Sequence, residues 1–205
     1  MSSEQYLSGS YKNQSETDGN IEQSALRSMK AIQQFPYDSS IKISGKTLAE
    51  RTQLTRILKR GACTAKHELL AIDLDGLAFP ILFLTYPFLW SKLLVDYPNE
   101  LKKLAGQMPL QYHLVLGLLN NNAIELIDVT WDPPLQKGGF PVGKIGHQIV
   151  SMPMAVVPEN TPTTHYSAEE RAMYIERLKP TIPWSHVIPV FYDKLNNWLA
   201  SLRVR

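Results

Sequence analysis

Cysteine is almost absent from this chain, since Cys63 is the single one among 205 residues. One cysteine excludes a disulfide within the chain and any metal site built from several thiolates. A chain without disulfides suits a reducing compartment, so we expect the protein in the cytoplasm. If the protein uses a reactive thiol, that thiol is Cys63.

The chain also lacks a long apolar run and an excess of charge of either sign. Its longest apolar stretch, Leu77–Trp90, is short and interrupted by proline, so we expect no membrane span. The polar segment Met1–Asn20 has no apolar core of the kind that secretory signals carry. With 21 basic and 19 acidic residues the net charge is +2, which indicates no nucleic-acid partner.

The residues that are present in quantity are typical of a globular domain. Hydrophobic residues make up 44% of the chain and charged residues 20%, and its length is sufficient for one real core. Residues 1–20 are rich in Ser, Gln, Asn and Gly, which predicts a disordered tail. We therefore expect a single domain over residues 21–205.

The hydrophobic patterns predict helices first, then mostly antiparallel strands, then helices. Helical spacing of apolar residues predicts helices at Ile21–Gln34, Thr47–Lys59, Cys63–Leu74, Ser167–Leu178 (Ser167 as N-cap) and His186–Leu202, the last broken near Pro189. Strands are predicted at Ala78–Thr85, in a following hairpin and at Gln148–Val157, and Ser91–Leu104 is expected to be partly helical. This order indicates an α+β fold.

The hairpin brings a histidine toward an aspartate. Two β-like runs, Tyr112–Leu116 and Ile124–Thr130, lie on either side of Asn120-Asn121. A two-residue turn at the two asparagines would pair His113 with Asp128 on one face of the ribbon. Paired positions hold their Cβ atoms about 4.5–5.5 Å apart. That distance suits a carboxylate that orients an imidazole.

Cys63 would complete a catalytic set with these two residues. It follows the break at Gly61 and begins a predicted helix, whose N-terminus stabilises a thiolate. His113 would take the thiol proton and return it to the leaving group, and Asp128 would fix its tautomer. The backbone N–H of Cys63 would be one oxyanion donor. His67 shares a helix face with Cys63 and would be a second base or a polar residue of the core.

The same residues resemble a known family. The Gly-x-Cys-x-x-Lys-His-x-Leu-Leu segment at Gly61–Leu70 resembles the nucleophile segment of transglutaminase-like cysteine proteins. The segment Ile127-Asp128-Val129-Thr130-Trp131-Asp132-Pro133, which follows the His113 strand, resembles that family's aspartate segment. The resemblance covers about residues 30–157, and it is weaker in the helix at Asn196–Leu199.

This resemblance implies a papain-like α+β fold in which the helix bearing the cysteine packs on an antiparallel sheet. It implies Cys63 as nucleophile, His113 as base and Asp128 as orienter, with no cofactor or metal. Tyr37 is the candidate for an oxyanion contact and Trp131 for a wall of the site. The implied enzyme is a hydrolase or acyltransferase that forms a thioester with an amide or other acyl carbonyl of a small molecule, a peptide or a protein side chain.

The chain departs from the animal crosslinking enzymes of that family, because it lacks their calcium sites and extra β domains. It is similar to minimal bacterial-type members, which include peptidases, amidases, deamidases, acyl-transfer enzymes and inactive relatives. A fold of this kind does not fix the substrate. One alternative is therefore a binding protein without catalysis on the same fold, with aromatic residues such as Trp131 and Trp184 at its partner surface.

A second alternative comes from Asp73-Leu74-Asp75-Gly76. These residues resemble the first motif of haloacid-dehalogenase-like phosphatases, in which the first aspartate attacks phosphate. Leu77 stands where that motif has threonine, and the segment follows helices rather than a first strand. A short motif without its structural context often arises by chance, and the end of a helix explains the segment equally well.

Overall fold

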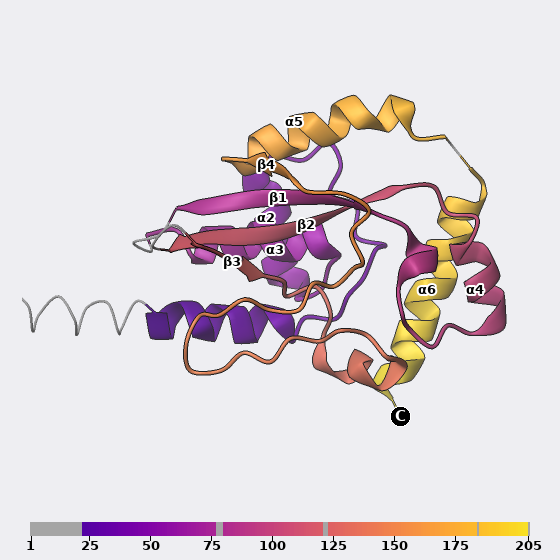
Figure 1. Ribbon diagram of the computed structural model, residues 1–205, viewed down its shortest axis with the longest axis horizontal. Helices are drawn as coiled ribbons and strands as arrows, with labels where there is room; N and C mark the ends of the chain where they lie inside the picture. Colours follow the sequence, from indigo (N-terminus) through magenta and orange to yellow (C-terminus); the bar gives the residue numbers. More distant parts are fainter. Residues whose placement is uncertain (1–21, 77–79, 121–122, 184, 205) are drawn as a thin grey trace, which may run out of the picture.

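The computed structural model describes residues 22–76, 80–120, 123–183 and 185–204. Its helices are a segment at 22–33, α2 (Leu48–Leu58), α3 (Cys63–Asp73), α4 (Asn99–Ala105), α5 (Ala168–Leu178) and α6 (Val187–Arg203), with short 3-10 turns η1 (Trp90–Lys92), η2 (Pro133–Gly138) and η3 (Lys179–Thr181). Strands β1 (Ile81–Phe88), β2 (Gln111–Asn120), β3 (Ala123–Ile127) and β4 (Thr163–His165) form an antiparallel sheet in the order β3-β2-β1-β4 (Figure 1). The predicted α+β class is confirmed.

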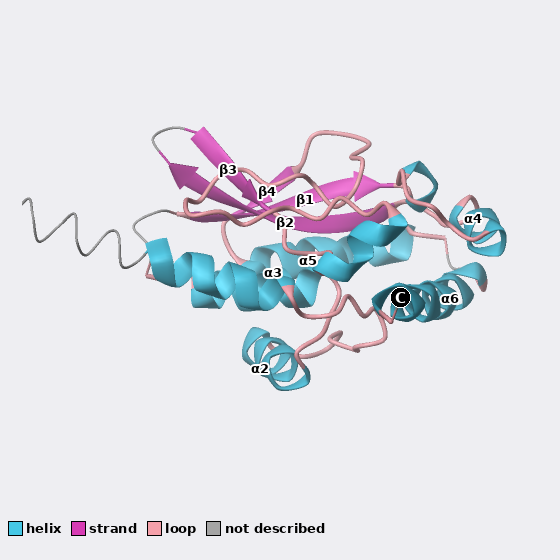
Figure 2. Cartoon of the chain, turned by 90° about the horizontal axis from the view of Figure 1, so that it is seen from below, coloured by secondary structure: helices cyan, strands magenta, loops and turns pink. Residues whose placement is uncertain are grey.

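Helix α3 lies directly against one face of this sheet, whereas α4 and α6 lie together beyond the end of the strands (Figure 1 and Figure 2). Leu69 and Leu70 of α3 pack with Leu114 and Leu116 of β2, and all four are buried. Burying a leucine side chain contributes roughly 2 kcal/mol. The prediction of a mostly buried helix at Cys63–Leu74 is confirmed, and the sheet therefore fixes the position of Cys63 at the N-terminal end of α3.

Side-chain caps set where two other helices begin. Thr47 and Glu50 form a capping box at the start of α2, in which each side chain bonds the other's backbone N–H. The Ser167 hydroxyl accepts from Glu170 N at the start of α5, as the sequence predicts. The predicted helices at Thr47–Lys59 and Ser167–Leu178 are confirmed to within a residue or two, and so is the partly helical segment before the hairpin.

The predicted register of the hairpin is wrong by two residues. In the structure Asn120 pairs with Ala123 and Leu116 with Ile127, whereas the predicted register opposes Leu119 to Asn122; residues 121–122 lie outside the described residues. The β2–β3 ladder ends at the Leu116–Ile127 pair, and Asp128 comes after it. His113 and Asp128 are therefore not a paired position of the ribbon, and it is contacts from outside the hairpin that bring their side chains together.

Two further predictions are also wrong. Residues 148–157 do not form a strand, because their backbone groups bond singly to varied partners: Met152 N donates to Leu126 O and Ala155 N to a side chain. Helix α6 is not broken at Pro189. Proline there is the third helical residue, where a backbone N–H has no partner within the helix, so none is lost.

The described residues bear on the predicted first helix and on the expected absence of a membrane span, but not on the predicted tail. The tail expected at residues 1–20 lies outside the described residues, and the predicted first helix is present as residues 22–33. Across the ranges described, none of the helices has both the length and the apolar content needed to cross a bilayer.

Helix α6 joins the end of the chain to the region of Cys63. The Arg203 guanidinium donates to both carboxylate oxygens of Asp132, at 2.7 and 2.8 Å, and also to Tyr37 O at 3.2 Å. Asp132 in turn accepts from Tyr37 N at 2.8 Å. Because the Asp132 side chain is buried, this bidentate pair holds three distant segments together.

We expect Arg203→Gln to destabilise the fold by about 2–4 kcal/mol, because it leaves the buried carboxylate of Asp132 without its cation. Lys194→Gln is the matched control, since Lys194 pairs with Glu100 on the surface, where such pairs contribute about 1 kcal/mol or less. Urea unfolding followed by circular dichroism measures both. Equal losses in the two variants would contradict a structural role for the Arg203–Asp132 pair.

Candidate active site

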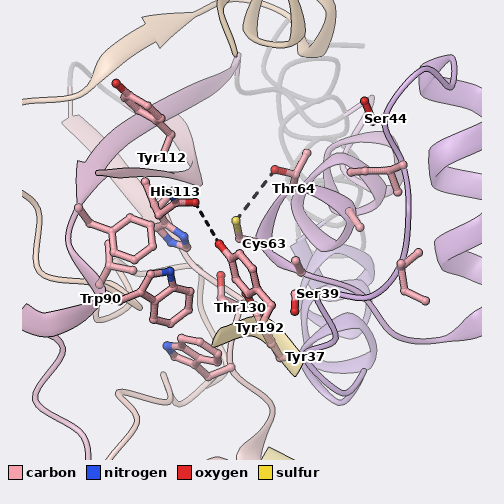
Figure 3. Close-up of a pocket in the computed structure, with 18 of the residues that line it drawn as sticks. Tyr37, Ser39, Ser44, Cys63, Thr64, Trp90, Tyr112, His113, Thr130 and Tyr192 are labelled. Atoms are coloured by element: carbon pink, nitrogen blue, oxygen red, sulfur yellow. Dashed lines mark hydrogen bonds between the residues drawn. The ribbon is translucent and has the colours of Figure 1, made fainter. Parts of the chain in front are cut away.

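A cleft of about 650 Å³ opens at the N-terminal end of α3 (Figure 3). Cys63 lies in it, with His113 of β2 on the opposite wall. Aromatic side chains from separate parts of the chain form most of the remaining surface: Tyr37, Phe88, Trp90, Tyr112, Trp131 and Tyr192. The cleft therefore places the one thiol of the chain beside a histidine in a mainly apolar surrounding.

The backbone before α3 passes so close to that helix that only glycine fits at position 61. A Cβ atom on Gly61 would lie 2.8 Å from Ala65 Cβ, closer than side chains tolerate. Gly61 N donates to Pro36 O at 3.1 Å, and Asp38 N to Gly61 O at 3.3 Å. Ala62 is extended and Cys63 is the first helical residue, so its N–H is one of those that the helix leaves unpaired. The prediction that Cys63 begins a helix after a glycine break is confirmed.

The Asp128 carboxylate is fully buried and satisfied by three donors. Its Oδ2 accepts from His113 Nε2 at 2.8 Å and from Ala155 N at 2.7 Å, while Oδ1 accepts from Thr130 N at 3.1 Å. Burial alone would raise the pKa of Asp128, but the His113 charge and these hydrogen bonds hold it well below its usual range. Asp128 is therefore a carboxylate at neutral pH.

His113 and Cys63 shift each other's protonation. Burial lowers the pKa of His113, but the charges of Asp128 and of the Cys63 sulfur outweigh it and raise that pKa. Burial raises the pKa of Cys63, but the positive charge of the nearby His113, with a contribution from Arg171, lowers it to about 7. Since Nε2 of His113 bonds Asp128, Nδ1 is the ring nitrogen left for the sulfur. The pair favours thiolate and imidazolium.

His67 belongs to the core and is not a second base. Its Nδ1 donates to Cys63 O at 2.8 Å and its Nε2 accepts from Val129 N at 3.2 Å. These two bonds require the neutral tautomer, although Nε2 is also 3.6 Å from Asp128 Oδ1. Burial lowers the pKa of His67 to about 4. Its part in the site is to hold the segment after β3 against α3.

The two residues expected near the oxyanion have different surroundings. The Tyr37 N–H is bound to Asp132, so only its hydroxyl is left for a ligand, and burial keeps the pKa of that hydroxyl well above 10. Trp131 packs on Tyr37 with ring centres 4.6 Å apart, and its Nε1 donates to Ala155 O. Trp131 is a buried wall of the cleft rather than an exposed partner surface; Trp184 lies outside the described residues.

Several cleft residues carry no signal in the sequence. Tyr192 comes from α6 and donates its hydroxyl to Gln111 Oε1 at 3.1 Å. Trp90 and Thr130 also line the cleft, and the Nε1 of Trp90 and the Oγ1 of Thr130 are themselves buried. The segment at 86–91 contributes Phe88 and Trp90 to the cleft, and residues 133–143 contribute nothing to its lining.

Lys66, to which the sequence assigns no role of its own, is also buried. Its ammonium donates to Gln33 O at 3.3 Å, Phe35 O at 2.9 Å and Thr130 O at 3.0 Å. Burial lowers its pKa to about 7, against the pull of Asp132 and Asp128. The three bonds tie α3 to the segments on both sides of the cleft.

The described residues contain no group of three or more His, Cys, Asp and Glu side chains placed to hold a metal ion. The chain matches no family model, no curated protein and no solved structure. Its chemistry is therefore inferred from the contacts of its own residues.

We expect iodoacetamide to alkylate Cys63 with a pH midpoint of about 7. His113→Ala removes the positive charge while the burial stays, so the midpoint should rise to about 8.5 or above, the value of an ordinary thiol. Intact-protein mass spectrometry across pH gives the rates. His147→Ala, an exposed position outside the cleft, should leave the midpoint unchanged. The same midpoint in His113→Ala would refute the pair.

We expect the stability of the protein to fall as pH drops from about 6.5 to about 4. His67 has a folded pKa of about 4, below the usual imidazole value of about 6.5, so the unfolded chain binds its proton first. The contribution of His67 is therefore complete above about pH 6.5 and is lost below it, at up to roughly 1.4 kcal/mol per pH unit. His113, whose folded pKa is raised, is protonated in both states in this window.

Urea unfolding at a series of pH values measures this slope. His67→Gln should flatten it, and His147→Gln should not, because His147 is exposed. A slope that survives in His67→Gln would assign the acid sensitivity to other groups.

Proposed function

We propose that this protein is a cysteine-nucleophile acyl-transfer enzyme of the transglutaminase-like type. The observation that carries the proposal is the buried Asp128–His113 hydrogen bond beside the thiol of Cys63. A nucleophile, a base within reach of it and a group that orients the base make the general form of such sites. Each of the three side chains has surroundings that suit its proposed role.

The mechanism begins with the thiolate of Cys63, which attacks the carbonyl carbon of an amide or related acyl group. The oxygen gains negative charge and accepts from the Cys63 N–H, which the start of α3 leaves unpaired. The carbon–nitrogen bond then breaks, His113 gives its proton to the leaving amine, and a thioester remains on Cys63.

The second half returns the enzyme to its starting state. Water or an amine attacks the thioester while His113 accepts its proton, and the Cys63 thiolate leaves. Water gives hydrolysis and an amine gives acyl transfer. Asp128 keeps Nε2 of His113 protonated throughout, so that Nδ1 faces the sulfur.

A papain-like arrangement is part of the proposal. Three features support it: the cysteine begins a helix, that helix packs on an antiparallel sheet, and the histidine comes from a strand of the sheet. The aspartate follows the neighbouring strand. The order of the three residues along the chain agrees with the family resemblance of the sequence.

The phosphatase alternative lacks its structural context. Asp73 is the last residue of α3 rather than the end of a strand, and its carboxylate pairs with Arg56 at 2.6 Å. The alternative of a binding protein without catalysis predicts that Cys63 does not form an acyl adduct, so acylation of the thiol separates it from the enzyme.

We expect p-nitrophenyl acetate to acetylate Cys63, because an activated ester needs little help with its leaving group. Intact-protein mass spectrometry detects the adduct, and release of nitrophenolate gives the rate. Cys63→Ala should give no adduct at all. Asp128→Asn should fold but acylate at least about a hundredfold more slowly, because His113 loses its orienting charge.

A second step asks what resolves the thioester. Glycinamide added to the acetylated protein should form acetylglycinamide if an amine is the natural acceptor, and acetate otherwise. No adduct in the wild type, with Cys63 accessible to iodoacetamide, would favour the binding-protein alternative.

A further inference from the structure

A second pocket adjoins the cleft and has a different chemical character. It measures about 560 Å³ and lies between α5, the segment at 43–46 and the start of β2. Ser44, Thr64 and Tyr112 belong to both pockets, and Figure 3 shows them on the side of the cleft away from Trp90 and Tyr37. Thr64 directly follows Cys63, so a ligand in the second pocket would reach toward the thiol.

Arg171 of α5 is the unusual residue of this pocket. Its side chain lines the pocket and the residue is 96% buried, since only 4% of its surface is exposed. Its Nε has no hydrogen-bond partner, and no ion pair reaches its guanidinium from any residue that the structure describes. A buried cation without a partner is costly, so a fold that keeps one has a use for it.

The carboxylates near Arg171 are already occupied. Glu68 accepts from Arg51 Nε and Nη2 with both oxygens at 2.7 Å, and Glu176 pairs with Lys179. Both glutamates line the pocket, and both are neutralised by these neighbours. Of the charged side chains in the lining, Lys46 and Arg171 are left as excess positive charge.

The rest of the lining is apolar enough to hold an organic body. Ile43, Ala172, Ile175 and Ile182 contribute to the walls. The volume also exceeds what a single inorganic ion needs, because one water occupies about 30 Å³ of liquid. The chemistry therefore fits a molecule with an apolar part and one negatively charged end.

We propose that this pocket binds the oxyanion end, a carboxylate or a phosphate, of an organic ligand, and that Arg171 is its anchor. The planar guanidinium offers a pair of parallel donors to such a group. The identity of the ligand rests on the proposed function: if the protein is an acyl-transfer enzyme, the ligand of this pocket is its acyl substrate. Its charged end would lie on Arg171 and its reacting carbonyl at Cys63.

A titration with glutarate and with inorganic phosphate tests the pocket itself. The protein is ¹⁵N-labelled Cys63→Ala, so that no step depends on the thiol, and the ionic strength is held constant. We expect saturable shifts of the amide signals of α5 around Arg171 with at least one of the two probes. A stronger response to glutarate identifies a carboxylate ligand, and a stronger response to phosphate a phosphorylated one.

Arg171→Gln should weaken that binding at least about tenfold, the usual effect of losing a hydrogen bond to a charged group. Arg177→Gln is the matched control, because Arg177 is exposed on the same helix and outside the pocket. No saturable shift with either probe, or equal affinity in Arg171→Gln, would overturn the proposal.

Two further readouts separate a ligand anchor from other roles. Arg171→Gln should unfold in urea at the same or a higher concentration than the wild type, because a buried unpaired charge is removed; a clear loss of stability would indicate a structural arginine. Should that variant fail to fold, Arg171→Lys keeps the charge without the paired donors and should still bind glutarate more weakly. An arginine that acts only on the thiolate would move the alkylation midpoint of Cys63 and leave glutarate binding intact, which would also contradict the proposal.

The outcomes for the pocket and for the enzyme are independent. Glutarate binding in Cys63→Ala without any acetyl adduct in the wild type would retain the pocket and remove the acyl chemistry. An acetyl adduct without glutarate binding would retain the acyl chemistry and remove the proposed anion pocket.

Discussion

A carboxylate removed from water is the constraint on which the rest of the site depends. Asp128 is fully buried, and such a charge is tolerated only when several donors surround it. The donors come from the segment after β3, from the loop at Ala155 and from β2. Satisfying one side chain therefore draws three segments together, and the histidine among them acquires the charge that lowers the pKa of Cys63.

Helix α3 provides the fixed frame against which those segments settle. Its polar residues Lys66, His67 and Glu68 are all buried. Lys66 donates to three backbone carbonyls, His67 accepts from a backbone amide, and Glu68 pairs with Arg51. Buried polar groups that are fully satisfied favour one arrangement over its competitors, because any shift leaves one of them unpaired. The same helix packs its leucines on the sheet, so the apolar and polar contacts specify a single position for Cys63.

Much of the local structure can be predicted from the sequence, because its causes are local. Thr47 and Ser167 signal helix starts through their own side chains, and Gly61 marks the close approach before α3. The helix order and the α+β class follow from apolar spacing alone. The structure also brings Cys63, His113 and Asp128 to one place, although the hairpin pairing that predicts this is not its cause.

Where the sequence misleads, the cause lies in contacts between distant segments. Counting from Asn120-Asn121 gives the wrong register, since nothing local distinguishes one asparagine pair from the next as a turn. Asp128 meets His113 because Ala155 and Thr130 hold the carboxylate beyond the end of the ladder. Arg171, Tyr192 and Arg203 have no signal at all, as each acquires its role only from residues far along the chain.

The link between Arg203, Asp132 and Tyr37 has a consequence for synthesis. Ribosomes make the chain from its N-terminus, so Cys63, His113 and Asp128 emerge well before α6 does. Until α6 emerges, Tyr192 is missing from the cleft and Asp132 has no cation to neutralise it. The reactive centre of a nascent chain is thus left without one of its walls until α6 has been made.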